Sequence, residues 1–279
     1  MTPDRPVPTW IRRLERPEEY VAAEELQQIC WQAEPIEAVP LNLMVTLQHE
    51  GGLVLGAFTP EDQLVGFVLG FLGREDGRLK HCSHMAAVLP AYRRQRIVYR
   101  LKMAQRAIVL ADGLDVMTWT ADPLQYPNAS LNAAALGAIC RTYKREVYGN
   151  MRMALNGALP TDRLYWRWEL ASPRVEECAR TGEPARAPVA PTALTDVDLA
   201  GAAPRLRRTR EPAGPLVGIQ IPRRLHDVLA HDAGWALEWR QGTRVLFEAA
   251  FAAGYTVVNF TADPDVPEAL GRYTLARPA

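Results

Sequence analysis

The stretch MAAVLPAYRRQRIVYRL, residues 85–101, decides the fold because its pattern changes from extended to helical within a few residues. The apolar run before Pro90 is typical of a strand, which proline ends because it has no N–H to donate. Apolar residues then recur at steps of four and three up to residue 111, which predicts an amphipathic helix. Arg93, Arg94 and Arg96 stand where this helix begins, and unpaired N–H groups and the helix dipole favour a bound phosphate there.

Upstream of this stretch, short apolar runs alternate with turn signals such as Thr59-Pro60-Glu61-Asp62. Three strands joined by two tight turns predict an antiparallel meander. Two helices are expected before it. The predicted helices cover residues 18–31 and 41–50, and the predicted strands cover residues 53–58, 64–72 and 78–88.

Downstream of the long helix, Gly113 ends the helical pattern and residues 114–120 form an apolar run. The strands before and after the helix are expected to be parallel neighbours joined by a right-handed crossover. Asn128 is expected to cap a helix that runs to about Leu136, and residues 139–147 are expected to form a further strand. These elements predict a mixed sheet with helices on both faces.

The composition shifts to Pro, Ala and Arg between residues 172 and 215, which indicates a linker or an irregular excursion. Beyond it, residues 216–221 and 255–260 are expected to be strands. The helix between them places Trp235 and Trp239 on one face, where they are expected to be core residues. The predicted domains are therefore residues 1–171, the segment 172–215, and a small C-terminal α/β extension at 216–279.

The overall charge of the chain gives no reason to expect a polyanionic partner. Lys and Arg balance Asp and Glu at 32 each, so no global field attracts nucleic acid or an anionic membrane, and neither partner is expected. The four cysteines have no metal-ligand spacing, so no metal and no disulfide are expected. We expect a cytoplasmic protein, because no apolar stretch has the length of a signal peptide or a membrane span.

Residues 88–101 resemble the pyrophosphate loop of the GNAT superfamily of acyltransferases, in which Arg/Gln-x-x-Gly-x-Gly/Ala lies between a central strand and a helix. Arg93 matches the first position of that motif. The two small positions fall on Arg96 and Val98, which is a departure from the family pattern. Glycine in such a loop lets a ligand approach the backbone closely.

Further stretches resemble a subgroup of GNAT acetyltransferases of unassigned substrate, so the likeness runs from about Leu53 to Leu170, with weaker support at the tail. They are residues 83–85, 118–124, 128–132, 136–138 and 236–240, together with Tyr143 and Tyr148-Gly149. The resemblance implies an α/β (α+β) fold: a GNAT-like mixed, mostly antiparallel sheet with helices on both faces.

The resemblance also implies acetyl-CoA or another acyl-CoA as cofactor, such as succinyl-CoA, bound where the two strands flanking the long helix splay apart. An amine would attack the thioester directly, and the acceptor would be a small-molecule amine or an amino acid. A homodimer is a further expectation. The residues expected to bind the cofactor are Ala87, Val88, Arg93, Arg94, Gln95, Arg96, Ile97, Val98 and Asn128.

Direct attack on a thioester needs a base for the ammonium and an acid for the leaving thiolate. His84, just before the expected fork, is the candidate base, and a core histidine is the alternative. His81 faces the other side of the strand and is a weaker candidate.

The position of the tyrosine that serves as acid in GNAT enzymes is Ala133 here, so another group must take that role. Tyr143 and Tyr148 are the candidates, and Tyr126 or water are alternatives. Asp122 and Trp119 are expected to contact the substrate.

Three functions are compatible with these residues. An N-acyltransferase for small amines or amino acids is favoured by His84 and the arginine cluster. A non-catalytic module with weakened CoA binding is favoured by the lost glycines and the missing tyrosine. A protein-lysine acetyltransferase would use the same fold with an open groove for a peptide.

Overall fold

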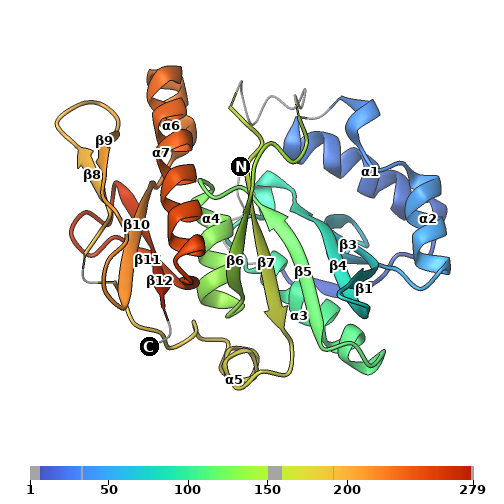
Figure 1. Ribbon diagram of the computed structural model, residues 1–279. Coiled ribbons are helices and arrows are strands. Elements are labelled where there is room, and N and C mark those ends of the chain that lie inside the picture. The colour runs from blue at the N-terminus through green and yellow to red at the C-terminus, as the bar shows by residue number, and fades with distance from the viewer. Residues whose placement is uncertain (1–6, 33, 150–158, 191, 278–279) are drawn as a thin grey trace. The chain divides into compact units, whose positions relative to one another are not determined.

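The computed structural model describes residues 7–32, 34–149, 159–190 and 192–277, and these form two compact units (Figure 1). The first unit holds the described residues up to Trp119, and the second holds those from Thr120 onward. The boundaries expected at residues 171 and 215 do not coincide with this division and stay predictions.

The first unit is built on strands in the order β1-β2-β3-β4-β5. Neighbouring strands are antiparallel except for β4 and β5, which are parallel, as the crossover through the long helix predicts. The expected meander is confirmed, although β1 was not foreseen in the polar, proline-rich N-terminus. The strands are β1 (Trp10–Arg13), β2 (Leu53–Phe58), β3 (Leu64–Glu75), β4 (Arg78–Val88) and β5 (Val116–Ala121).

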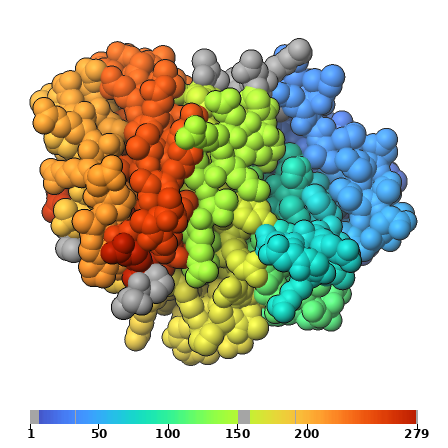
Figure 2. Space-filling model, in the orientation of Figure 1, coloured from blue at the N-terminus to red at the C-terminus, as the bar shows by residue number. Residues whose placement is uncertain are grey.

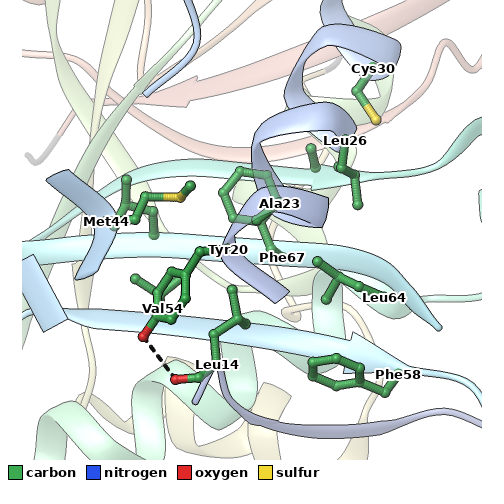
Figure 3. Packing of buried hydrophobic residues seen from close by; sticks show 12 residues of the cluster. Leu14, Tyr20, Ala23, Leu26, Cys30, Met44, Val54, Phe58, Leu64 and Phe67 are labelled. Carbon is green, nitrogen blue, oxygen red and sulfur yellow. Dashed lines mark hydrogen bonds between the residues drawn. The ribbon is translucent and has the colours of Figure 1, made fainter. Parts of the chain in front are cut away.

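Helices cover both faces of this sheet. The helices α1 (Pro17–Trp31) and α2 (Leu41–His49), with the short η1 (Pro35–Glu37) between them, pack on one face over a core that includes Met44 and Phe67. Figure 3 shows this cluster, in which the Tyr20 hydroxyl donates to the Leu14 carbonyl at 2.9 Å. The opposite face carries α3 (Ile97–Ala111), which follows the short η2 (Pro90–Tyr92).

Glu19 ties the start of α1 to β1. Its carboxylate is 5% exposed and accepts hydrogen bonds from Arg12, Arg16 and the Glu15 backbone N–H. Burial alone would raise the pKa of Glu19, but these donors lower it to about 2. The helix that covers the central strands is thus anchored by a carboxylate that stays ionised.

The second unit has antiparallel strands in the order β7-β6-β11-β12-β10. The C-terminal residues add to this sheet, because Val257 of β11 pairs with Cys140 of β6. The unit also contains a second, two-stranded sheet, which is made of β8 and β9. The strands are β6 (Ile139–Lys144), β7 (Arg163–Glu169), β8 (Thr195–Asp198), β9 (Arg205–Thr209), β10 (Leu216–Pro222), β11 (Thr256–Ala262) and β12 (Leu270–Ala276).

The main helix of this unit is α7 (Ala233–Ala252), whose N-terminus is capped by the Asp232 side chain. Its inner face buries Trp239 completely, as expected, whereas Trp235, also expected in the core, is only half-buried and Val245 on the outer face is 56% exposed. Figure 2 shows the side chains of α7 at the surface, in orange-red. The other helices of the unit are α4 (Tyr126–Ala129), the π-helical η3 (Ser130–Ala135), α5 (Pro173–Thr181) and α6 (Leu225–His231).

The expected fold class is confirmed: the sheet is mixed and mostly antiparallel, with helices on both faces of its first part. Two local predictions were wrong. Asn128 is no cap, because the N-cap position of α4 is Gln125 and Asn128 lies inside the helix. The segment 172–215 is not irregular throughout, since it contains α5, β8 and β9.

Candidate functional site

The central feature of the first unit is the short pairing between β4 and β5. Only His81↔Met117 and Cys82↔Thr118 pair, although both strands continue beyond these residues. The β4 ladder to β3 is also irregular here, because Gly70 pairs with Ser83 while Leu69 pairs with Met85. His84 is therefore the extra residue of a β-bulge, a feature that bends a strand and re-aims its side chains. The two strands separate at this bulge.

His84 lies at the fork. Its ring centroid is 5.9 Å from that of Phe71, and the side chain reaches solvent. The part that is buried loses hydration, which lowers the pKa of His84 below its ordinary value. The imidazole is consequently neutral at pH 7 and able to accept a proton.

A buried hydrogen-bond chain lies on the α3 side of the same strands. The Lys102 ammonium donates to the Ser83 hydroxyl at 2.7 Å, which donates to the Gln105 carbonyl oxygen at 2.8 Å. The Gln105 amide nitrogen is 3.0 Å from Nε2 of His81. Burial and the charge of Lys102 lower the pKa of His81 to about 4, so this histidine is a neutral structural acceptor.

Lys102 bridges the two strands of the fork. Besides its bond to Ser83 on β4, its Nζ lies 4.0 Å from the ring centroid of Trp119 on β5. Ser83 and Trp119 are the first residues beyond the last paired positions. Burial lowers the pKa of Lys102 to about 7, so its proton is exchangeable near neutral pH. Trp119 therefore makes a cation–π contact with Lys102, a contact that its position in the sequence did not predict.

The backbone of the arginine loop has a glycine-like conformation without glycine. Arg94 has φ 66° and Arg96 has φ 56°, both in the left-handed region. Arg96 is the N-cap of α3 and occupies the first small position of the resembled motif. The loop geometry is thus retained at a steric cost, and the first N–H groups of α3 have no partner within the helix.

The side chains of the loop point to several neighbours. The Arg93 guanidinium lies beside the Cys30 thiol of α1, and Arg96 stacks over Tyr99 with Cζ 4.4 Å from the ring centroid. Gln95 accepts a hydrogen bond from the Val7 N–H at 2.9 Å. Arg93, Arg94 and Arg96 are exposed.

The apolar members of the expected cofactor site serve the core. Ala87 packs with the α1–α2 side, and Val88 and Ile97 pack under α3, with Val98 half-buried against them. Their side chains are thus directed into the protein, and they could contact a ligand through the backbone.

The other expected site residues lie in the second unit. The Tyr143 hydroxyl donates to Asp162 at 2.7 Å, and burial together with that carboxylate raises the pKa of Tyr143 far above its ordinary value. Tyr148 is 43% exposed and its hydroxyl is 3.0 Å from that of Thr120. Tyr143 is therefore a committed donor, whereas Tyr148 reaches solvent.

Asp122 is fully engaged by the protein. One oxygen accepts from the Leu124 N–H at 2.8 Å and the other from Arg240 at 2.6 Å. Asn128 is exposed on α4. The carboxylate of Asp122 thus acts as a turn and ion-pair residue in this structure.

Sequence reasoning missed Lys102 and Arg240. Each is a cation on the buried face of an amphipathic helix, 4% and 1% exposed. The available signal was a charged residue at an apolar position of the helix. This signal is ambiguous, because a long charged side chain at such a position can also reach the surface with its head group.

Among the described residues, no group of three or more His, Cys, Asp or Glu side chains could hold a metal ion. No helix among those residues is long and apolar enough to cross a bilayer.

Comparisons with known proteins give structural similarity alone. No family model matches the sequence, and no curated protein matches it. The NatC complex bound to a Gag peptide and CoA is 13% identical, with a TM-score of 0.48 over 58% of this chain and 98% of that one. The ribosomal-protein-S18-alanine N-acetyltransferase from Escherichia coli is 17% identical, with a TM-score of 0.46 over 59% and 96%.

A third similar structure is a GNAT family acetyltransferase from Brucella melitensis in complex with acetyl-CoA. It is 19% identical, with a TM-score of 0.35 over 43% of this chain and 80% of that one. Identities this low do not transfer an activity.

The left-handed backbone at Arg96 predicts that Arg96→Gly stabilises the protein. Glycine relieves the Cβ clash, but it loses the Tyr99 contact and has more conformational freedom in the unfolded chain. We therefore expect the free energy of unfolding to rise by about 0.5–1 kcal/mol. Chemical denaturation with the full chain measures it. Arg93→Gly is the matched control, because Arg93 has φ −64° and no such strain to relieve. If Arg96→Gly lost as much stability as Arg93→Gly, this would contradict the inference that the backbone at Arg96 is strained.

Proposed function

We propose that this chain is an acyl-CoA-dependent N-acyltransferase of the GNAT type. It would move an acetyl or succinyl group to the amine of a small molecule or amino acid. The observation that supports this most is the fork: parallel β4 and β5 pair only at His81↔Met117 and Cys82↔Thr118, and α3, which follows β4, begins at a left-handed loop. The acyl-CoA thioester supplies the activated acyl carbonyl.

The residues at the fork fit such a cofactor in backbone geometry and charge. The glycine-like conformation of Arg94 and Arg96 leads into a 15-residue helix whose free N–H groups suit a pyrophosphate. Three exposed arginines add positive charge at the same place. Arg93, Arg94 and Arg96 would hold the pyrophosphate, with the N-terminus of α3.

His84 would act as the base. It lies in the bulge where the strands separate, and its lowered pKa keeps the imidazole neutral at pH 7. A neutral imidazole takes the proton that the acceptor ammonium must lose before the amide bond forms.

Lys102 would supply the proton to the leaving thiolate. The hydroxyl of Tyr143 is committed to Asp162, whereas the Lys102 ammonium sits between the strands of the fork with a pKa of about 7. A group with a pKa near the working pH is an effective proton donor. As the thioester C–S bond breaks, a proton of the Lys102 ammonium would pass to the sulfur of the leaving thiolate.

A non-catalytic module is the second candidate. It is supported by Arg93 resting beside Cys30 and Arg96 stacking on Tyr99, because both guanidinium groups already have contacts within the protein. Binding of acyl-CoA decides between the two candidates.

Isothermal titration with acetyl-CoA and succinyl-CoA tests the proposal. We expect binding to the full chain, and Arg93→Ala should weaken it about 10-fold by removing a charge-assisted contact. Arg78→Ala, at the opposite end of β4, serves as control and should bind unchanged. Absence of binding at millimolar concentration would end the catalytic proposal in favour of the module.

For the base, we expect His84→Gln to lower kcat/KM about 100-fold in a thiol-release assay with an acceptor found by screening amines. Activity of the unaltered protein should fall as pH drops through the lowered pKa of His84, because the protonated ring cannot accept a proton. The variant should lack this acidic limb and keep its affinity for acetyl-CoA. An unchanged acidic limb would assign the base elsewhere.

For the acid, kcat/KM should fall as pH rises through about 7, because the lysine loses the proton that it donates. Lys102→Met should lack this basic limb, with a lower maximum. Lys80→Met is the matched control, since Lys80 is another largely buried lysine of the same unit, paired with Glu75 at 3.1 Å. A basic limb that survives in Lys102→Met would show that Lys102 is structural.

A further inference from the structure

Arg240 of α7 is a buried arginine with donors to spare. It is 1% exposed, and its Nη2 donates to Asp122 at 2.6 Å. Its Nε and Nη1 are buried without a hydrogen-bond partner among the residues that the structure describes. Burying unpaired donors of a charged group is costly, so two donor atoms of Arg240 call for an acceptor.

A second guanidinium shares the same carboxylate. Nη1 of Arg163 lies 3.8 Å from the Asp122 oxygen that Arg240 contacts, and Arg163 is also buried. Burial lowers the pKa of Arg163, and the charge of Arg240 lowers it further. The other Asp122 oxygen is taken by the Leu124 N–H. One carboxylate thus stands between two arginines, and neither of its oxygens accepts a hydrogen bond from Nε or Nη1 of Arg240.

The neighbouring ion pair does not supply the missing acceptor. Arg244 binds Asp162 through Nε at 2.7 Å and Nη2 at 2.9 Å, so this pair is complete. Asp162 accepts in addition from Tyr143. Glu146 is 3.8 Å from Arg244, but its side chain is mostly exposed. The described neighbours of Arg240 in this cluster therefore leave its Nε and Nη1 without an acceptor.

We propose that Arg240 and Arg163 form a binding site for the carboxylate of a small organic acid. The planar pair of oxygens of a carboxylate matches the geometry of the two unpaired guanidinium donors of Arg240. This site goes beyond acyl transfer, because no step of the proposed reaction needs it.

The hydroxyl-bearing side of the cluster faces solvent. Tyr148 is 43% exposed, and its ring centroid is 5.1 Å from Cζ of Arg163. Its hydroxyl is 3.0 Å from the Thr120 hydroxyl, so one proton of this hydroxyl pair is used between them and the other can be donated to a ligand. A carboxylate that enters beside Tyr148 would meet hydroxyl groups first and guanidinium groups below them.

Titration calorimetry of the full chain with acetate, succinate and glutamate at low ionic strength tests the site. We expect at least one of them to bind with millimolar or tighter affinity. Arg240→Met combined with Asp122→Asn removes the donors of Arg240 together with the carboxylate that pairs with them, and should weaken binding at least 10-fold. Arg240→Lys, which keeps the charge but lacks the fork, should do the same if the double variant does not fold.

Arg244→Met combined with Asp162→Asn is the matched control. It removes one cation and one anion from the same cluster but keeps the free donors of Arg240, so binding should persist. Equal affinity in the unaltered protein and both Arg240 variants would overturn the site. So would absence of carboxylate binding at 10 mM (on the order of the weakest millimolar sites), tighter binding of phosphate, or a crystal structure with only water on the Arg240 donors.

Discussion

The short parallel pairing between β4 and β5 is the constraint on which the proposed site depends. A right-handed crossover through α3 makes the two strands neighbours, but they share only two paired positions. The bulge at His84 then shifts the β4 ladder and bends the strand away from β5. The fork, the exposed histidine and the loop before α3 all follow from this one interruption of regular pairing.

The helix α3 connects the two ends of the proposed chemistry. Its N-terminus carries the left-handed loop, and Lys102 within it reaches both strands of the fork through Ser83 and Trp119. Because Lys102, Ser83, Gln105 and His81 form a continuous chain of contacts, the polar groups under the sheet satisfy one another. Arg240 in the second unit shows the opposite situation, a buried cation whose donors exceed the acceptors that the described residues provide.

Much of the fold could be predicted from local patterns. The strand at residues 78–88 was expected with its observed bounds, and the long helix between Ile97 and Gly113 was expected because its apolar period and its glycine stop agree. The strand β1 and the elements within residues 172–215 were missed. Their short, polar or proline-rich segments acquire structure by pairing with distant residues, as Trp10 does with Phe58.

The sequence by itself determined where charge gathers: three arginines at a helix start and a histidine on the strand before it. Only the tertiary structure decided which charges are free to act. It commits Asp122 and Tyr143 to Arg240 and Asp162, and it places Lys102 between two strands that are far apart in the sequence. The reason is physical, because a side chain's protonation and its partners depend on burial and on neighbours brought together by the fold, which no local pattern encodes.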